Sequence, residues 1–135
     1  MKELVVKTSF SGVDIDVKFT DKINFIVQDS GTGKSYLFGL LSEYCQSVGI
    51  SCLLFNYATL PFVGSLRDIS VGKDVVILDN ADLYMNSDLL SFFESSGCLV
   101  IISIKSVAEL HSNSAGYYFV DYTNGVISTE RVKDE

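Results

Sequence analysis

The sequence predicts an α/β fold of three layers, α/β/α, with a largely parallel sheet and an antiparallel hairpin at each end. Short apolar runs alternate with segments of helical periodicity along the middle of the chain. That order is typical of parallel strands joined by crossover helices. At the C-terminal end, the turn Thr123-Asn124-Gly125 separates Tyr117–Tyr122 from Val126–Thr129, which predicts a hairpin.

The first third of the chain predicts a hairpin, a strand, a loop and a helix. Residues 3–9 are apolar and extended, and Val13–Phe19 alternates apolar with charged side chains, which is typical of a strand with one wet face. Ile23–Val27 predicts a short buried strand. After a glycine-rich loop, apolar residues at helical spacing over Leu37–Val48 predict an amphipathic helix that ends at Gly49.

The middle of the chain predicts three buried strands and one further helix. Ser51–Asn56, Val75–Leu78 and Cys98–Ile104 are apolar runs of strand length. Residues 57–73 are expected to be irregular, because Pro and Gly interrupt them. Ser87–Ser95 carries leucines and phenylalanines at the spacing of a short helix.

Composition favours a single folded domain over residues 1–135. Apolar residues make up 47% of the chain and charged residues 20%, which argues against disorder. The net charge of −7 repels phosphate backbones, so nucleic-acid binding is not expected. Without a signal peptide or an apolar run of membrane-spanning length, a cytoplasmic protein that does not engage membranes is expected, with its three cysteines reduced.

The segment Gln28–Ser35 matches most of a phosphate-binding loop, whose pattern is Gly, four residues, Gly, Lys and then Ser or Thr. Glycines let successive backbone N–H groups point at phosphates, Lys34 supplies a cation, and the Ser35 hydroxyl can ligate Mg²⁺. The buried strand before the loop and the amphipathic helix after it are the context that this motif requires. The residues expected to bind the nucleotide are Asp29, Ser30, Gly31, Thr32, Gly33, Lys34, Ser35 and Tyr36.

Gln28 stands where the pattern opens with Gly. A glutamine would strain the loop if the backbone needs a positive φ there. Two alternatives to nucleotide binding therefore stay open, a loop that binds nucleotide weakly or not at all, and a glycine-rich strand–helix connection without a ligand.

Asp79 directly follows the apolar run Val75–Leu78. Enzymes with a phosphate-binding loop need a second carboxylate at the end of a neighbouring strand for the shell of Mg²⁺. Ser35 and Asp79 are therefore the expected metal ligands. The alternative is an ordinary turn or capping aspartate, since Asp is common at such positions.

On Gln28–Ser35 and Val75–Asp79 the chain resembles the P-loop NTPase superfamily, and within it the additional-strand ATPases of the AAA and ABC/RecF-like groups. The opening hairpin before the loop strand is similar to ABC and RecF-like heads in particular. The resemblance implies one P-loop nucleotide-binding domain over residues 1–135. GTPase signatures are absent, so ATP with Mg²⁺ is the expected ligand.

The chain departs from that family at the residue after Asp79. The resembled ATPases usually carry Glu there to polarise the attacking water, whereas this chain has Asn80. An amide can orient a water but cannot take its proton, so hydrolysis should be slow. Asp82 is the candidate substitute, or else a solvated loop acid. The candidate catalytic residues are Lys34, Asp79, Asn80 and Asp82.

Two functions from different classes follow. The first is an ATP-binding P-loop protein with weak or partner-dependent ATPase activity. The second is a catalytically silent module of the same fold that acts by binding a protein partner. The ABC signature and the AAA helical lid are both absent, so a protein partner or a homo-oligomer is expected. The resemblance also implies a polar γ-phosphate sensor at Ser103, beside Lys105, although both could be ordinary strand-end residues.

Overall fold

Strands make up most of the regular structure in this protein. The computed structural model describes residues 1–10, 12–27, 33–55, 66–105, 110, 112 and 114–132. The strands in these residues are β1 (Leu4–Phe10), β2 (Val13–Phe19), β3 (Ile23–Ile26), β4 (Cys52–Phe55), β5 (Val75–Leu78), β6 (Leu99–Ser103), β7 (Ala115–Thr123) and β8 (Val126–Val132). The helices are α1 (Lys34–Val48), α2 (Leu66–Ser70) and α3 (Ser87–Ser95), with a 3₁₀ turn, η2 (Ala81–Leu83).

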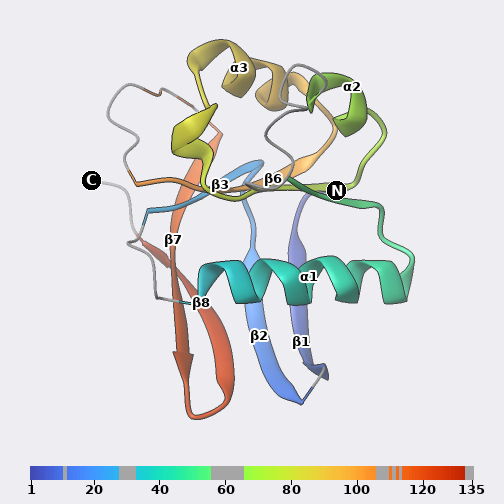
Figure 1. Ribbon diagram of the computed structural model, residues 1–135, viewed down its shortest axis with the longest axis vertical. Helices are drawn as coiled ribbons and strands as arrows, with labels where there is room; N and C mark the ends of the chain where they lie inside the picture. Colours follow the sequence, from blue (N-terminus) through green and yellow to red (C-terminus); the bar gives the residue numbers. More distant parts are fainter. Residues whose placement is uncertain are drawn as a thin grey trace.

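The described strands form one mixed sheet in the order β1-β2-β8-β7-β3-β6-β5-β4 (Figure 1). Strands β7, β3, β6, β5 and β4 run parallel to one another. Hairpins β1–β2 and β7–β8 are antiparallel, and β2 pairs with β8 in parallel, with Ile15 opposite Ile127. The N-terminal and C-terminal hairpins therefore lie side by side at one end of the sheet, joined through β2 and β8.

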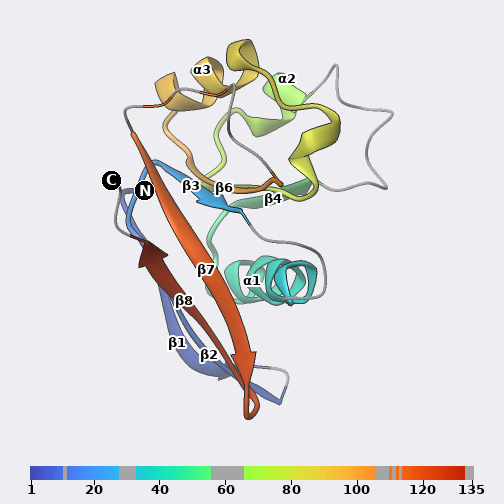
Figure 2. The same cartoon turned by 90° about the vertical axis from the view of Figure 1, so that its left-hand side faces the viewer.

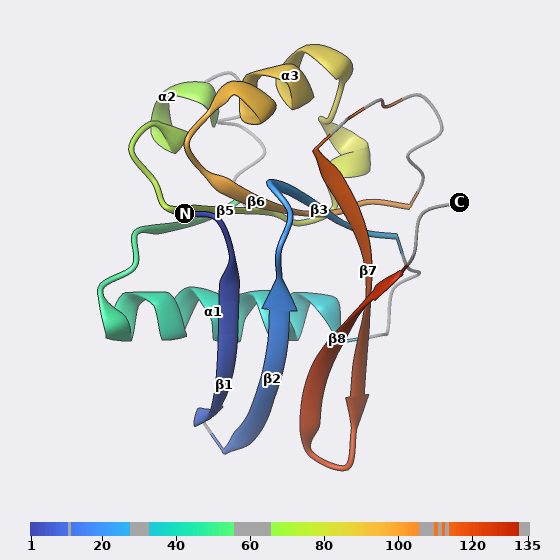
Figure 3. The same cartoon turned by 180° about the vertical axis from the view of Figure 1, so that it is seen from behind.

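The sheet curls around α1. Figure 2 shows this helix end-on, with β3, β4 and β6 above it and the two hairpins along its flank. From behind, β1 and β2 cross in front of the helix, and the β7–β8 hairpin lies by one end of it (Figure 3). The buried face of α1 carries Leu37, Phe38 and Leu41, which share one apolar cluster with residues of β1, β2 and β8. Helix α1 ends at Gly49, whose φ of 81° is a conformation that glycine adopts readily.

A second apolar cluster lies on the face of β5 and β6 opposite α1. Figure 1 shows α2 and α3 on that side of the strands and α1 on the other. There Leu90 and Phe93 of α3 and Leu66 of α2 pack over Val76 and Val100. Both faces of these two central strands are therefore buried, which explains why their sequences are continuous apolar runs.

The predicted three-layer α/β/α arrangement is wrong. The structure is a mixed, curled sheet shaped like a half-barrel, and in the described residues helices α2 and α3 cover only the half that contains β3, β6, β5 and β4. The hairpins lie together at one edge of the sheet. No described helix covers the outer face of the hairpins, because polar and apolar side chains alternate along their strands. In β2, Asp14, Asp16 and Lys18 face water, while the apolar residues between them pack toward α1. A strand face that is already polar needs no covering helix.

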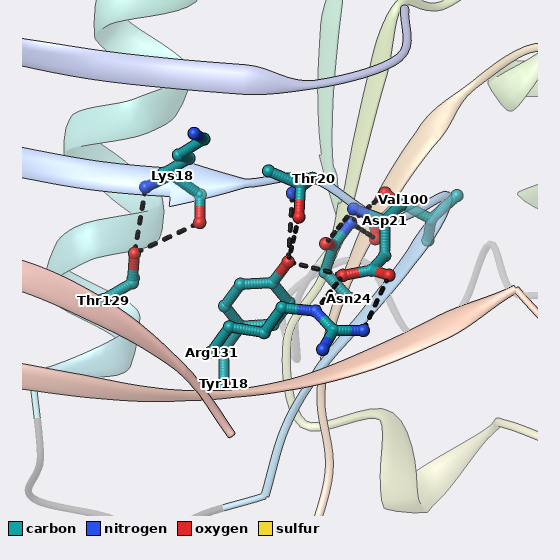
Figure 4. Close-up of polar contacts among 8 residues, drawn as sticks. All are labelled: Lys18, Thr20, Asp21, Asn24, Val100, Tyr118, Thr129 and Arg131. Atoms are coloured by element: carbon teal, nitrogen blue, oxygen red, sulfur yellow. Dashed lines mark hydrogen bonds and ion pairs between the residues drawn. The ribbon is translucent and has the colours of Figure 1, made fainter. Parts of the chain in front are cut away.

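A polar network joins the hairpins to the central strands (Figure 4). The Asp21 carboxylate, between β2 and β3, accepts hydrogen bonds from the Tyr118 hydroxyl and from Arg131 Nε at 2.9 Å. The buried Asn24 side chain donates to the carbonyls of Asp21 and Val100, at 2.7 and 2.9 Å. The network therefore ties β8 and β7 to the start of β3 and to β6.

Other expectations from the sequence have mixed outcomes. Residues 66–70 were expected to be irregular, but they form α2, whose Leu66 is fully buried. The three cysteines are free thiols, with Cys45 and Cys98 buried. Among the described helices, none is both long enough and apolar enough to cross a membrane.

Candidate functional site

A cavity of about 250 Å³ opens where α1 begins and β5 and β6 end. These strands run parallel to β3, so their carboxyl ends meet at the same edge of the sheet. Ligands of open α/β sheets commonly bind at that edge. The cavity is lined by Gly33, Lys34, Ser35, Tyr36, Asn80, Asp82, Ser103, Ile104 and Lys105.

Ser35 and Asp79 meet beside this cavity. The Ser35 hydroxyl donates a hydrogen bond of 2.8 Å to Asp79 Oδ2. The Asp79 side chain is buried, with 6% of the residue exposed, and among the described residues its Oδ1 has no hydrogen-bond partner. A buried carboxylate oxygen that lacks a partner is uncommon, because leaving it unpaired costs free energy. The predicted pair of metal ligands is thus in contact, with one oxygen open to a further group.

Two neighbours hold the backbone of Asp79 in place. Its N–H donates to the Phe55 carbonyl at 2.9 Å, and its own carbonyl accepts from the Tyr84 hydroxyl at 2.8 Å. The Tyr84 ring also meets the Phe55 ring edge-on. Burial, and then the negative charge of Asp79, raise the pKa of Tyr84, so this phenol stays a proton donor. No sequence pattern pointed to Tyr84 as part of this site.

The first turn of α1 brings two further predicted residues to the cavity. Gly33 has a φ of 90° and its carbonyl accepts the first helical hydrogen bond, from Leu37 N–H at 2.9 Å. Lys34 begins the helix and is buried. A cation beside the N-terminus of a helix favours an anionic ligand. The predicted nucleotide-binding residues Asp29, Ser30, Gly31 and Thr32, together with Gln28, lie outside the described residues.

Asn80 and Asp82 also line the cavity. Asn80 has a left-handed backbone, with φ 52° and ψ 48°, and leads into η2. Both carboxylate oxygens of Asp82 accept from the Lys105 N–H, at 2.9 and 3.1 Å. The Asp82 carboxylate therefore joins η2 to the end of β6. The buried Ser103 lies next to this junction and also lines the cavity.

The donor atoms at Ser35 and Asp79 fit a hard cation. Mg²⁺ prefers oxygen ligands and in nucleotide sites takes one or two from the protein, the others coming from phosphate and water. A hydroxyl and a carboxylate meet that requirement. In the part of the chain that the structure describes, no group of three or more His, Cys, Asp or Glu side chains could hold a metal. The site therefore suits a metal that arrives with a ligand.

Known proteins resemble this chain only in fold. No protein-family model matches it, and no curated protein sequence does. The crystal structure of a DNA replication initiation factor is similar, with a TM-score of 0.50 and 14% sequence identity over 64% of this chain. The match covers 32% of that protein, so the chain corresponds to about a third of its length. At 14% identity, this likeness concerns the fold alone.

Proposed function

We propose that this chain binds ATP together with Mg²⁺ at the cavity beside α1, and that it hydrolyses ATP slowly or only with a partner. The observation that carries the proposal is the pair formed by Ser35 and Asp79, at 2.8 Å, with Asp79 Oδ1 lacking a partner in the described residues. The pair lies beside the buried Lys34. The Ser35 hydroxyl and the Asp79 carboxylate can bind a metal ion, and the Lys34 ammonium can bind the phosphates that the metal ion carries.

Each of these groups would have its own part in binding. Lys34 would place its ammonium on the terminal phosphates, and the backbone N–H groups at the start of α1 would face the same phosphates. Ser35 and Asp79 would hold Mg²⁺, which would neutralise charge on the phosphate oxygens when bound. Tyr84 would keep the Asp79 backbone at a fixed position through its hydrogen bond.

Slow hydrolysis follows from the side chains near the expected γ-phosphate. Asn80 carries an amide, which cannot accept a proton from water. Asp82 carries a carboxylate, but both of its oxygens already accept from the Lys105 N–H. That engagement also favours the second candidate function, a silent module that binds nucleotide or a protein partner without turnover.

The likeness to a DNA replication initiation factor is compatible with binding of nucleotide or of a protein partner. The net charge of −7 argues against direct contact with DNA. We therefore do not extend a role in replication to this chain.

Calorimetric titration with Mg·ATP tests the proposal. Wild type should bind saturably, and Lys34→Ala should weaken binding roughly 30-fold or more, because a buried charge pair with phosphate is lost. Lys7→Ala removes an exposed lysine on β1 and should bind as wild type does. Folded wild-type protein that binds no ATP would contradict the proposal.

Steady-state turnover separates the two candidate functions. We expect a rate well below about 1 s⁻¹, at the low end of ordinary enzymes. Faster turnover that disappears in Asp79→Ala would exclude the silent module. Binding without measurable turnover would favour it.

A further inference from the structure

Two tyrosines form an exposed stack beside the cavity. The ring centroids of Tyr36 and Tyr122 lie 5.8 Å apart with an angle of 20° between the ring planes. The two residues are 45% and 46% exposed. In the described part of the chain, the other aromatic pairs each include a buried or half-buried ring. This pair alone presents two exposed rings, a surface whose burial would be favourable.

The stack adjoins the residues that are expected to hold phosphate. Tyr36 follows Ser35 in α1 and lines the cavity. Tyr122 arrives from β7, and its Cβ lies 3.5 Å from where a Cβ on Gly33 would stand. The missing side chain at Gly33 thus leaves room for the Tyr122 ring against the start of the helix.

The order of strands places Tyr122 on one side of β3, and Asp79 and Ser103 on the other. Strand β3 has β7 as one neighbour, and β6 and then β5 on its other side. Asp79 follows β5 and Ser103 ends β6, so the metal and the terminal phosphate belong to that side. A nucleotide with its phosphates at the start of α1 and its last phosphate toward β5 would direct its base toward β7.

The length of β7 places Tyr122 beyond the sheet edge at which β3 ends. Strand β3 finishes at Ile26, which pairs with Tyr118. Strand β7 continues to Thr123. Tyr122 therefore stands about 13 Å further along β7 than the last residue paired with β3. This extension brings an aromatic side chain to the side of the cavity away from Asp79.

We infer that Tyr36 and Tyr122 form the surface on which the base of the bound nucleotide stacks, and that the ligand is a purine nucleotide. The inference rests on the proposed nucleotide binding and extends it from the phosphates to the base. Stacking suits every base, but the double ring of a purine covers more of two adjacent tyrosines than a single pyrimidine ring does.

The test compares Mg·ATP with Mg·tripolyphosphate, which has the phosphates and no base. Wild type should bind ATP more tightly than tripolyphosphate, and more tightly than CTP. Tyr36→Ala and Tyr122→Ala should each weaken ATP binding roughly 5- to 150-fold, and should leave tripolyphosphate binding unchanged. Tyr36→Phe and Tyr122→Phe should keep the wild-type affinity, because the aromatic ring is retained.

Phe119→Ala is the matched control, since Phe119 is also an aromatic residue of β7 and is 50% exposed. It should bind both ligands as wild type does. Equal losses for ATP and tripolyphosphate in the tyrosine variants would overturn the inference, because the tyrosines would then act through the shape of the phosphate site. Unchanged ATP affinity in both alanine variants would overturn it as well.

The affinities of the wild type for ATP, tripolyphosphate and CTP test the stacking inference even if an alanine variant fails to fold. Equal affinities for ATP and tripolyphosphate would overturn the stacking inference and leave the phosphate site standing. CTP binding as tight as ATP binding would overturn the assignment of a purine. If neither ATP nor tripolyphosphate binds, the proposed function itself has failed.

Discussion

At the scale of single residues, Gly116 has the least room for a side chain among the described glycines. A Cβ at this position would overlap the Asp21 carboxylate and would lie 3.0 Å from Arg131 Nε. We predict that Gly116→Ala lowers the free energy of unfolding by roughly 1–3 kcal/mol, because the Asp21 hydrogen bonds must break or the strands must shift. Urea unfolding, followed by circular dichroism, measures the change.

Gly39→Ala is the control for this substitution. A Cβ at Gly39 meets nothing within 4 Å, and the residue lies inside α1. Alanine there should stabilise the protein by about 0.5–1 kcal/mol through helix propensity. Equal behaviour of the two alanine variants would show that the contact between Gly116 and Asp21 does not matter.

The sequence predicted part of the candidate site. Ser35 and Asp79 could be paired in advance because each belongs to a pattern, a loop motif and an acid after an apolar run. The role of Tyr84 could not be predicted. This residue reaches the Asp79 carbonyl because the 3₁₀ turn η2 precedes it, and so short a turn leaves no periodic pattern in the sequence. Tyr122 could not be predicted either, because its position depends on how far β7 extends past β3.

At the scale of elements, Asp21 joins the link between β2 and β3 to Arg131 of β8. Burial alone would raise the pKa of Asp21, but the hydrogen bonds from Arg131 and Tyr118 more than offset it, so the pKa is lowered. A carboxylate with a lowered folded pKa contributes stability above its unfolded pKa of about 4, and that contribution is lost as the pH falls through the folded value.

We therefore predict that the wild type loses stability below about pH 4 and that Asp21→Asn removes part of this loss. The Arg131 side chain is 41% exposed, so the ion pair should contribute only about 1 kcal/mol or less. Urea unfolding at pH 6 and pH 3 measures the effect. Asp16→Asn, an exposed carboxylate on β2, should keep the wild-type pH dependence. An identical pH dependence in Asp21→Asn would refute the prediction.

Most elements were predictable because their signals are local. Alternation over Val13–Phe19 predicted β2, and Asn124-Gly125 predicted the turn, where both residues have positive φ. The pairing of β2 with β8 was not predictable, because it joins residues more than 100 positions apart. Helix α2 escaped prediction because five residues carry little periodicity, and burial of Leu66 stabilises the helix through tertiary contacts.

At the scale of the whole molecule, β5 and β6 hold two apolar clusters together. Val75 and Leu99 face the cluster around α1, while Val76 and Val100 face the cluster beneath α3. Neighbouring residues of the same strand therefore contribute to both cores. Neither cluster can lose its packing while these strands stay in their native positions, so we expect a single cooperative unit.

We predict that Leu41→Ala and Leu90→Ala, one in each cluster, each lower the free energy of unfolding by roughly 2–5 kcal/mol within one transition. Val48→Ala, at a residue of α1 that is 52% exposed, should change it by about 0.5 kcal/mol or less. Thermal unfolding by calorimetry and circular dichroism tests this. Two separate transitions in either leucine variant would show that the clusters unfold independently.

The layering was the part of the whole fold that the sequence misrepresented. Strand and helix order alone suggests helices on both faces of a flat sheet, but the wet faces of the hairpin strands leave nothing for a second layer to cover. The apolar faces of the same strands pack against α1 instead, so the sheet curls around this helix and does not lie flat between two helical layers.

The left-handed backbone at Asn80 has an evolutionary consequence. Asn tolerates φ 52° better than most residues, whereas glutamate would lose about 1–2 kcal/mol there. Glutamate would otherwise have to unwind η2, the turn that carries Asp82 to Lys105. The replacement that would give this chain a general base therefore disturbs the wall of its own cavity. We therefore expect Asn80→Glu to cost stability, and a general base at this position to need a compensating change in η2.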